Sequence, residues 1–274
     1  MYVFAMPCRG SGRKNQLTQW LKEGVEWIER QPYIDDYRII VIEQIDDLPF
    51  NLGWNINVGF DLTNRDNSAL DYEYSYEHRY VYQPVDCIPQ DRPRSIIGIP
   101  DQEQRIHVTD GQWQQMSFDD YCVSSSDLIV LLTPLWWQGS CWTSWVSYYK
   151  AIITGRGAYE KLNGHSNEYF GWGCEDDDLL LRIELVGDKI VAEHRAMVFD
   201  EMVNLEQDHC YDAKTHEPTT NIVWNRARKE RNLYSSGLNT LSYEVDSINE
   251  FAQHVYLVKV AHGGEHGFSK KWNL

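Results

Sequence analysis

The sequence predicts an α/β protein in which strands and helices alternate around one doubly wound, mixed sheet. Lys14 to Glu29 carries apolar residues at helical spacing, and Asn55 to Leu62 is expected to begin the next helix. Arg38–Ile42 contains an unbroken β-branched run suited to a buried parallel strand, and Tyr80–Val85 is expected to form another strand. Ligands of such sheets bind beyond the carboxyl ends of the strands, so Asp86 lies where a ligand is expected.

Two more strands and a long loop complete the expected elements. Tyr2–Met6 predicts a first strand that ends at a Pro7–Gly12 turn, and Asp127–Thr133 predicts a later strand. The segment from Asp91 to Gly111 is polar with scattered prolines, so we expect mostly loop there. No repeat or linker divides the chain. We therefore expect one domain over residues 1–274, with a nucleotide-binding half (1–90), an acceptor-binding half (91–261) and a loosely ordered tail (262–274).

Composition limits the class of partner. The chain has 274 residues, 42% of them hydrophobic, which suffices for one large core. Its 41 acidic residues against 25 lysines and arginines give a net charge of −16, so no nucleic-acid partner is expected. A nucleotide diphosphate can still bind where a divalent cation bridges it to carboxylates. The 11 tryptophans and 17 tyrosines agree with a glycan partner, although most of these rings are expected to build the core.

The sequence also indicates a compartment. Six cysteines show no CxxC spacing or paired-loop pattern, which favours a reducing environment over a disulfide framework. No run of 18 or more apolar residues occurs, and the first six residues are too short and uncharged for a signal peptide. We therefore expect a soluble, cytoplasmic protein without a membrane span.

The most informative stretch is the block of residues 163–178. It ends in four consecutive acids, Glu175 to Asp178, preceded by Gly171-Trp172-Gly173. An indole face between glycines is a suitable platform for a sugar ring, and a neighbouring carboxylate can take a proton from a sugar hydroxyl. Each acid taken alone is equally well explained by a helix N-terminus, where the macrodipole favours negative charge.

Taken whole, this block resembles the beta-1,4-galactosyltransferase family, whose pattern is Asn-Gly followed by aromatic-Gly-Trp-Gly-X-Glu-Asp-Asp. Pro7-Cys8-Arg9 resembles the family's Pro-Phe-Arg after its first strand. Three further segments match family segments in the same order along the chain: Phe50–Phe60, Gln83–Pro89 and Gly237–Tyr243. The resemblance implies a GT-A fold and a metal-dependent, inverting glycosyltransferase that uses a UDP-sugar donor and a glycan or glycoside acceptor.

The resemblance also implies a metal and a donor site. Asp86 matches the metal-binding acid, while His209 and Glu206 match the family's later Met-X-X-His ligands; Asp208 and Asp212 are close enough to compete. A carboxylate, carboxylate and imidazole set suits Mn²⁺ or Mg²⁺. The nucleotide contacts are expected at Pro7, Arg9, Phe50, Asn51, Val85 and Asp86. Two positions depart from the family: Pro84 replaces its first motif acid, and Leu52 replaces its arginine.

On the acceptor side, Asp176 matches the general base of the family. Glu175 and Asp177 are expected to hold sugar hydroxyls, and Trp172 with Gly173 to contact a sugar ring. Asp178 is expected to face the helix start or solvent.

The resemblance also bears on donor choice. Without gaps, the family's aromatic-aromatic-Gly-Gly segment of the donor pocket falls on Ser147-Tyr148-Tyr149-Lys150, where no glycine stands, so either an insertion or deletion shifts this region or the pocket accepts a different sugar. UDP-galactose is the family default, and UDP-xylose, UDP-glucose and an N-acetylhexosamine donor stay open. We expect that galactose is not the best donor, because a side chain here would fill the space of its hydroxymethyl group.

Two other functions fit parts of the sequence. A catalytically inactive carbohydrate-binding relative would keep the sugar platform and tolerate Pro84 and Leu52. A glycoside hydrolase uses paired carboxylates, which the acid block supplies, but it leaves the other matching segments unexplained.

Overall fold

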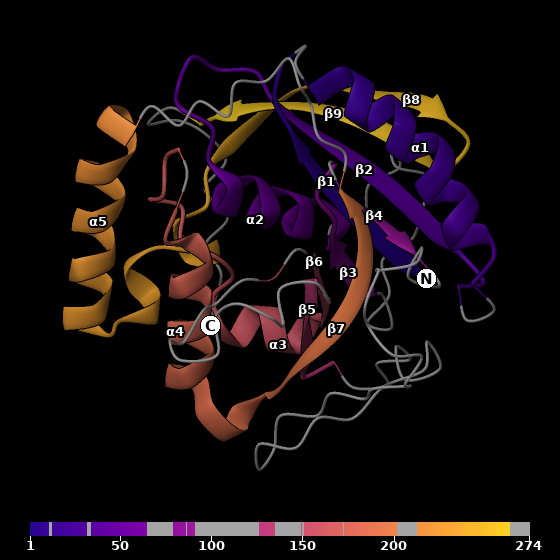
Figure 1. Ribbon diagram of the computed structural model, residues 1–274. Coiled ribbons are helices and arrows are strands. Elements are labelled where there is room, and N and C mark those ends of the chain that lie inside the picture. Colours follow the sequence, from indigo (N-terminus) through magenta and orange to yellow (C-terminus); the bar gives the residue numbers. More distant parts are fainter. Residues whose placement is uncertain are drawn as a thin grey trace, which may run out of the picture.

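The computed structural model describes residues 1–10, 13–31, 34–64, 79–85, 87–90, 126–134, 149, 151–171, 173–201 and 213–263. Within these residues, nine strands form one sheet in the order β4-β7-β5-β6-β3-β1-β2-β9-β8 (Figure 1). The strands are β1 (Tyr2–Cys8), β2 (Tyr37–Gln44), β3 (Arg79–Tyr82), β4 (Cys87–Gln90), β5 (Leu128–Pro134), β6 (Ala151–Gly155), β7 (Val191–Glu201), β8 (Tyr243–Ala252) and β9 (Val255–His262).

The pairing is mixed. Parallel pairs join β1 to β2, β1 to β3, β2 to β9 and β5 to β7. Antiparallel pairs join β3 to β6, β5 to β6, β4 to β7 and β8 to β9. The helices of the described residues are α1 (Lys14–Glu29), α2 (Leu52–Thr63), α3 (Arg156–Lys161), α4 (Glu175–Val186) and α5 (Ala213–Glu230), with short 3₁₀ turns at η5 (Gly187–Lys189), η6 (Leu233–Ser235) and η7 (Leu238–Thr240).

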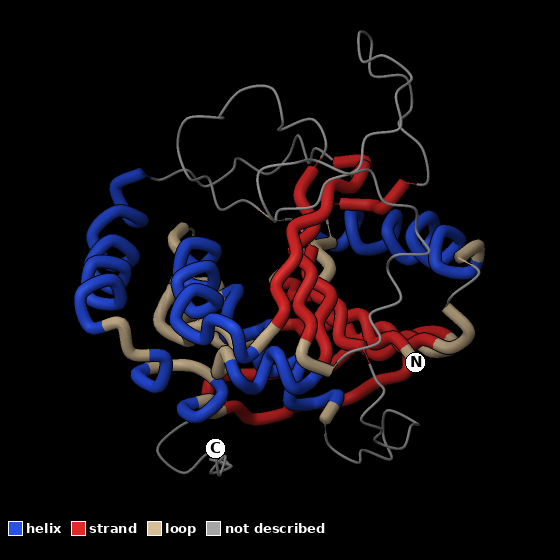
Figure 2. The backbone as a smooth tube through the Cα atoms, turned by 90° about the horizontal axis from the view of Figure 1, so that it is seen from below, coloured by secondary structure: helices blue, strands red, loops and turns tan. Residues whose placement is uncertain are grey.

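Helices cover both faces of the sheet, as Figure 2 shows. Successive strand residues point to opposite faces, so each central strand supplies two cores. Phe4 and Met6 of β1 pack in one cluster with Trp20 and Ile28 of α1. The neighbouring residues Val3 and Ala5 pack in the other, with these residues of α2, α3 and α4: Trp54, Phe60, Tyr159 and Leu179. The predicted doubly wound, mixed α/β sheet is therefore confirmed.

The predicted elements are present, with some shifts of their ends. The helix Lys14–Glu29 has the predicted bounds. The first strand runs two residues beyond Met6, because Pro7 and Cys8 continue the parallel pairing with β2. The second helix begins at Leu52 rather than Asn55, because the Asn51 side chain accepts a hydrogen bond from the Trp54 amide at 2.9 Å and caps the helix.

The third strand is shorter than predicted, and the tail begins later. β3 ends at Tyr82, and β4 starts a second short strand at Cys87. His262, placed in the loosely ordered tail by the sequence analysis, is the last residue of β9, which lies in parallel beside β2. The placement of His262 in the tail was wrong, because His262 pairs with Tyr243 of β8, and β9 itself pairs with β2, more than two hundred residues earlier. In the described part of the chain, no helix combines the length and apolar character needed to cross a membrane.

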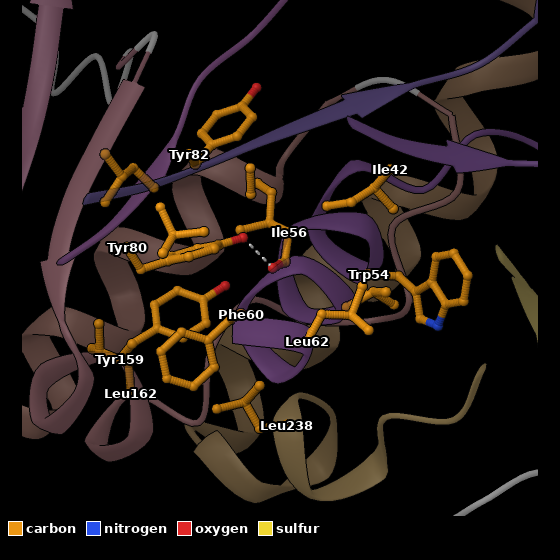
Figure 3. Close-up of a cluster of buried hydrophobic side chains, with 14 of the residues drawn as sticks. Ile42, Trp54, Ile56, Phe60, Leu62, Tyr80, Tyr82, Tyr159, Leu162 and Leu238 are labelled. Atoms are coloured by element: carbon orange, nitrogen blue, oxygen red, sulfur yellow. Dashed lines mark hydrogen bonds between the residues drawn. The ribbon is translucent and has the colours of Figure 1, made fainter. Parts of the chain in front are cut away.

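The contact between α2 and the sheet is close at Gly59. The Tyr80 hydroxyl donates to the Ile56 carbonyl at 2.5 Å, and Phe60 packs edge-on against the Tyr80 ring at 5.4 Å (Figure 3). A Cβ at Gly59 would lie 2.6 Å from the Ile42 side chain and 2.7 Å from the Tyr80 hydroxyl. Glycine here lets α2 lie against β1, β2 and β3, which positions the segment before it.

We predict that Gly59→Ala lowers the free energy of unfolding by about 1–3 kcal/mol, the usual cost of overpacking a close-packed core. Equilibrium urea unfolding measures this loss. Because the Tyr80 hydroxyl is one of the crowded atoms, Gly59→Ala combined with Tyr80→Phe should cost less than the sum of the two single changes. A fully additive double variant would contradict the assigned contact.

Candidate functional site

The acid block forms the first turn of α4. Glu175, Asp176, Asp177 and Asp178 occupy that turn, and Cys174 precedes it with a φ of 69°. The helix N-terminus favours negative charge, so the turn tolerates four acids. Burial, together with the charges of Asp177, Glu175 and Asp178, raises the pKa of the Cys174 thiol to about 11. The block therefore concentrates negative charge. It also lies at a helix N-terminus, the position that the sequence analysis gave as the structural explanation for each acid taken alone.

Glu175 turns back toward the chain before the helix. Its carboxylate accepts a hydrogen bond from the Gly173 amide at 2.9 Å. Loss of solvation raises the pKa of Glu175, and the charge of Asp177 adds to this, although backbone donors at Glu175 and Gly173 lower it. The side chain thus orders Gly173, one of the two predicted acceptor residues at the platform.

Asp176 and Asp177 are partly exposed. Asp176 lies near the phenol of Tyr149: burial raises the pKa of Tyr149, and the charge of Asp176 is the largest of the added causes. A carboxylate that is partly exposed beside a buried, neutral phenol can receive a proton from a bound hydroxyl. The geometry is thus compatible with the base predicted at Asp176.

Asp178 corrects the sequence-based expectation, which placed it toward the helix start or solvent. Its side chain is 5% exposed and accepts a hydrogen bond from Arg182 Nε at 2.5 Å. The Tyr169 hydroxyl donates to its other oxygen at 3.3 Å. The expectation failed because Asp178 and Arg182, spaced i and i+4, share the inward face of α4.

Arg182 connects this ion pair to two other segments. Its Nη1 donates to the carbonyls of Leu162 and Gly164 at 3.3 and 3.2 Å, and its Nη2 donates to the Ser236 carbonyl at 2.7 Å. A buried guanidinium with these partners keeps its charge and its donors satisfied. The first turn of α4 is thereby fixed to the Asn163 segment and to residues 233–236.

The Asn163 and Gly237 segments also bind each other directly. Asn163 Nδ2 donates to the Leu233 carbonyl at 2.8 Å and to Asn239 Oδ1 at 2.7 Å. Its backbone carbonyl accepts from the Leu238 amide at 2.9 Å. A Cβ at Gly237, whose φ is 151°, would lie 2.0 Å from the Asn163 carbonyl oxygen. Only a glycine allows this approach, which explains why these motif residues occur together.

A network of buried hydrogen bonds connects the segment after Asn163 to Asn57 of α2. Asn57 Nδ2 donates to the His165 carbonyl at 2.7 Å and to Asn167 Oδ1 at 2.8 Å. Its Oδ1 accepts from the Tyr159 hydroxyl at 2.8 Å and from the His165 amide at 2.9 Å, so its amide is fully satisfied. Tyr159 and Tyr149 in turn bond the two nitrogens of the His165 ring, at 2.7 and 2.8 Å.

The predicted donor corner lies at the N-terminus of α2. Asn51 is fully buried, and its Nδ2 donates to the Asn167 carbonyl at 2.7 Å while its Oδ1 caps α2. Arg9 donates to the Leu48 carbonyl and, at 3.0 Å, to the Asp46 carbonyl. Both side chains are therefore engaged in holding the loop between β2 and α2. Pro7 and Val85 are buried, and Phe50 is partly exposed.

The donor corner and the platform meet at one backbone contact. The Gly171 amide donates to the Phe50 carbonyl at 2.8 Å. The structure therefore brings together the Phe50, Asn163, Glu175 and Gly237 segments. Trp172, which lies between Gly171 and Gly173, is outside the described residues.

The three predicted metal ligands, Asp86, Glu206 and His209, also lie outside the described residues. The strands that flank them are described. Cys87, directly after Asp86, pairs with Glu201, the last residue of β7. Among the residues that the structure describes, no group of three or more His, Cys, Asp or Glu side chains is arranged to hold a metal ion.

Some residues of this site were missed by sequence reasoning. Arg182 could have been found from the sequence, because it stands four residues after Asp178, the spacing of an ion pair on one face of a helix. Asn57 lies in a matched segment but was assigned no role. His262 bonds Asp46 at 2.7 Å and stacks on Trp54, and this contact has no local signal because the residues are distant in the chain.

Known proteins resemble this chain in sequence and in fold. A family model described as the N-terminal domain of galactosyltransferase matches residues 151–200, which include β6, α3, the acid block and α4. Beta-1,4-galactosyltransferase 1 of Homo sapiens is 25% identical over 240 residues, covering 87% of this chain and 50% of that protein. Beta-1,4-galactosyltransferase 3 of Homo sapiens is 32% identical over 87 residues, covering 32% of this chain and 21% of that protein.

Solved structures share the fold. A mutant Drosophila beta-1,4-galactosyltransferase 7 in complex with manganese, UDP-Gal and xylobiose has a TM-score of 0.57 and 17% identity, covering 96% of this chain and 95% of that one. The same catalytic domain with xylobiose has a TM-score of 0.58. The predicted GT-A type fold and the resemblance to the beta-1,4-galactosyltransferases are confirmed. The chain spans about half the length of the beta-1,4-galactosyltransferase 1 relatives that it matches.

We predict that His165 makes stability depend on pH. Burial, aided by the charge of Arg182, lowers the pKa of His165 to about 3, against a usual value of about 6.5. Between about pH 6.5 and 3, His165 is therefore protonated in the unfolded chain but neutral in the folded chain. Stability is full above about pH 6.5 and falls by about 1.4 kcal/mol per pH unit as the pH drops from there toward 3.

Urea unfolding at pH 7, 6 and 5 measures this slope, in a range above the titration of ordinary carboxylates. His165→Phe, which retains a ring in the same place, should reduce the slope of unfolding free energy against pH by about 1.4 kcal/mol per pH unit, the contribution of one proton. An unchanged slope in His165→Phe would show that another group is responsible.

Proposed function

We propose that this chain, a relative of the beta-1,4-galactosyltransferases, is a metal-dependent inverting glycosyltransferase. It transfers a sugar from a UDP-sugar to a hydroxyl of a glycan acceptor and forms a β-linkage. The observation that carries the proposal is that three of the matching segments, Phe50–Phe60, the 163–178 block and Gly237–Tyr243, contact one another around the N-terminus of α4. The buried Asp178 anchors that turn, and the partly exposed Asp176 remains at its surface beside Tyr149.

In the proposed reaction, Asp176 receives the proton of the acceptor hydroxyl. The hydroxyl oxygen forms a bond to the anomeric carbon while the bond from that carbon to the UDP oxygen breaks on the opposite face. The electron pair leaves with UDP, and the single displacement inverts the anomeric centre. Glu175 holds the Gly173 backbone in position, and Asp177 is proposed to accept hydrogen bonds from sugar hydroxyls.

Asp86, Glu206 and His209 are proposed to hold the metal. Cys87 pairs with Glu201, and Asp86 directly precedes Cys87 in the sequence. Glu206 is five residues beyond Glu201, within about 18 Å even if the chain is fully extended. The register of β4 and β7 is thus compatible with a shared ion, and two carboxylates with an imidazole suit Mn²⁺ or Mg²⁺. The ion would neutralise the charge that develops on the departing diphosphate.

Donor preference is proposed to follow from Tyr149. Tyr149 is 6% exposed, its hydroxyl is hydrogen-bonded to His165 at 2.8 Å, and it lies near Asp176. In the ungapped match to the family, a glycine stands at this position. A tyrosine there takes up space beside the acid block, which disfavours the hydroxymethyl group of galactose and favours a smaller sugar such as xylose.

One observation supports the alternative of an inactive carbohydrate-binding relative. Leu52, at the position of the family's arginine, packs partly against the main core and offers no charge to a diphosphate. Detection of UDP release distinguishes the two functions. The assay uses Mn²⁺, a panel of UDP-sugars and, as first acceptor, xylobiose, the glycan bound in the Drosophila complex. Binding of xylobiose without UDP release under any condition would favour the alternative.

We predict that UDP binds tightly only with Mn²⁺. Changing Asp86 or His209 to alanine should weaken this binding by about 10–100-fold, as loss of a metal contact does. Calorimetry of UDP binding with and without Mn²⁺ measures both effects. The exposed Asp188→Ala is the matched control for loss of one negative charge. Equal affinity with and without Mn²⁺ would contradict the metal-bridged model.

We predict that Asp176→Asn lowers kcat by about 10²–10⁴-fold, because a general base acts in the transition state. The affinity for UDP should change little, since the amide keeps the shape of the carboxylate. Steady-state kinetics and calorimetry test the two halves of this statement. Glu175→Gln and Asp177→Asn are the neighbouring controls. Near-normal turnover of Asp176→Asn beside an inactive neighbour would place the base at that neighbour.

We predict that UDP-xylose is a better donor than UDP-galactose. Tyr149→Ala should then shift the ratio of kcat/KM toward UDP-galactose by about 10–200-fold, the range that one small group is worth in a pocket. Tyr149→Phe keeps the ring volume and should leave the ratio unchanged. A wild-type enzyme that is clearly fastest with UDP-galactose would refute the donor assignment.

A further inference from the structure

Asp46 and His262 form a clamp between the loop after β2 and the end of β9. Oδ2 of Asp46 lies 2.7 Å from His262 Nδ1 and accepts the His262 amide at 2.8 Å. Its Oδ1 accepts from Gln44 Nε2 at 2.8 Å and from the Leu48 amide at 3.1 Å. Loss of solvation would raise the pKa of Asp46, but the hydrogen bonds from His262 and Gln44 outweigh it and lower the pKa to about 2. The carboxylate is therefore charged, and Nδ1 of the imidazole donates to it.

The imidazole ring is held between two aromatic side chains. It stacks on Trp54 with ring centroids 3.8 Å apart and an angle of 13°, and it lies 5.4 Å from the Phe170 ring. The Trp54 indole is itself fixed, because Nε1 donates to the Ser242 carbonyl at 3.1 Å. Among the described residues, His262 Nε2 is buried without a hydrogen-bond partner.

A buried nitrogen without a hydrogen-bond partner is destabilising, so an apolar ring would fill this place at lower cost. What the imidazole adds is its Nδ1 bond to Asp46. The ring therefore combines two tasks: it packs against Phe170, and the carboxylate fixes its orientation.

Phe170 leads directly into the sugar-binding segment. The Gly171 amide donates to the Phe50 carbonyl at 2.8 Å, and the Gly173 amide donates to Glu175 at 2.9 Å. The chain is thus restrained on both sides of position 172. The clamp contacts the chain before position 172, through the Phe170 ring, next to the Gly171 amide that donates to the Phe50 carbonyl.

We propose that His262 is a positioning residue, held by Asp46, that fixes the Phe170–Gly171 backbone and thereby the acceptor-binding segment of the site. The sugar-binding role of that segment rests on the proposed function. The mechanical role of His262 does not, so the two are tested separately.

Hydrogen exchange at the Gly171 amide tests the mechanical role without any substrate. His262→Asn keeps an amide donor for Asp46 and removes the ring; His262→Phe keeps the ring and removes the donor. Both should speed exchange of this amide by about tenfold or more, while amides of β1 keep their protection. His254→Asn is the matched control, because His254 also borders β9 and contacts an aromatic ring, Tyr37, at 5.8 Å.

Exchange at Gly171 within about twofold of wild type in either His262 variant would overturn the proposal. So would an equal increase in His254→Asn. In the UDP-release assay, the His262 variants should raise the KM for xylobiose by about tenfold with little change in kcat, since the platform contributes to ground-state binding. A fall in kcat at unchanged KM would also overturn it. If the wild-type protein releases no UDP, the proposed function fails, and the exchange result alone decides the role of His262.

Discussion

The buried ion pair between Asp178 and Arg182 is the contact on which the position of the acid block depends. Both side chains are almost wholly buried, and Arg182 reaches the carbonyls of the Asn163 segment and of Ser236. A buried pair is tolerated only when its remaining donors are satisfied, and these carbonyls satisfy them. One acid of the four is therefore structural, and the three before it are held in a defined direction.

The side-chain amides of Asn57 and Asn163 connect the segment held by this ion pair to α2 and to the Gly237 segment. Asn57 has all four of its side-chain hydrogen bonds, and Asn163 joins Leu233, Leu238 and Asn239. Fully satisfied polar networks of this kind specify one arrangement of the chain. Three of the segments that resemble the family, Phe50–Phe60, residues 163–178 and Gly237–Tyr243, are thus hydrogen-bonded to one another, which explains why they occur together in a chain of low overall identity.

The sequence alone was sufficient to predict the elements whose physical signal is local. The helix Lys14–Glu29 follows from its apolar period, and β2 from its β-branched run. It was insufficient where contacts join distant segments. Nothing near Asp178 tells which of four adjacent acids turns inward, and the place of His262 depends on the pairing of β9 with β2. The metal ligands Asp86, Glu206 and His209 stay predictions, because they lie outside the described residues.

Equilibrium unfolding of Arg182→Met tests the central claim most directly. Removal of the cation leaves Asp178 charged and buried, so the free energy of unfolding should fall by about 3–5 kcal/mol. Arg156→Met is the matched control, because Arg156 and Glu160 also pair at i and i+4 with 2.5 Å between the atoms but remain partly exposed. Its loss should be below about 1 kcal/mol. A loss below about 1 kcal/mol in Arg182→Met as well would contradict the account.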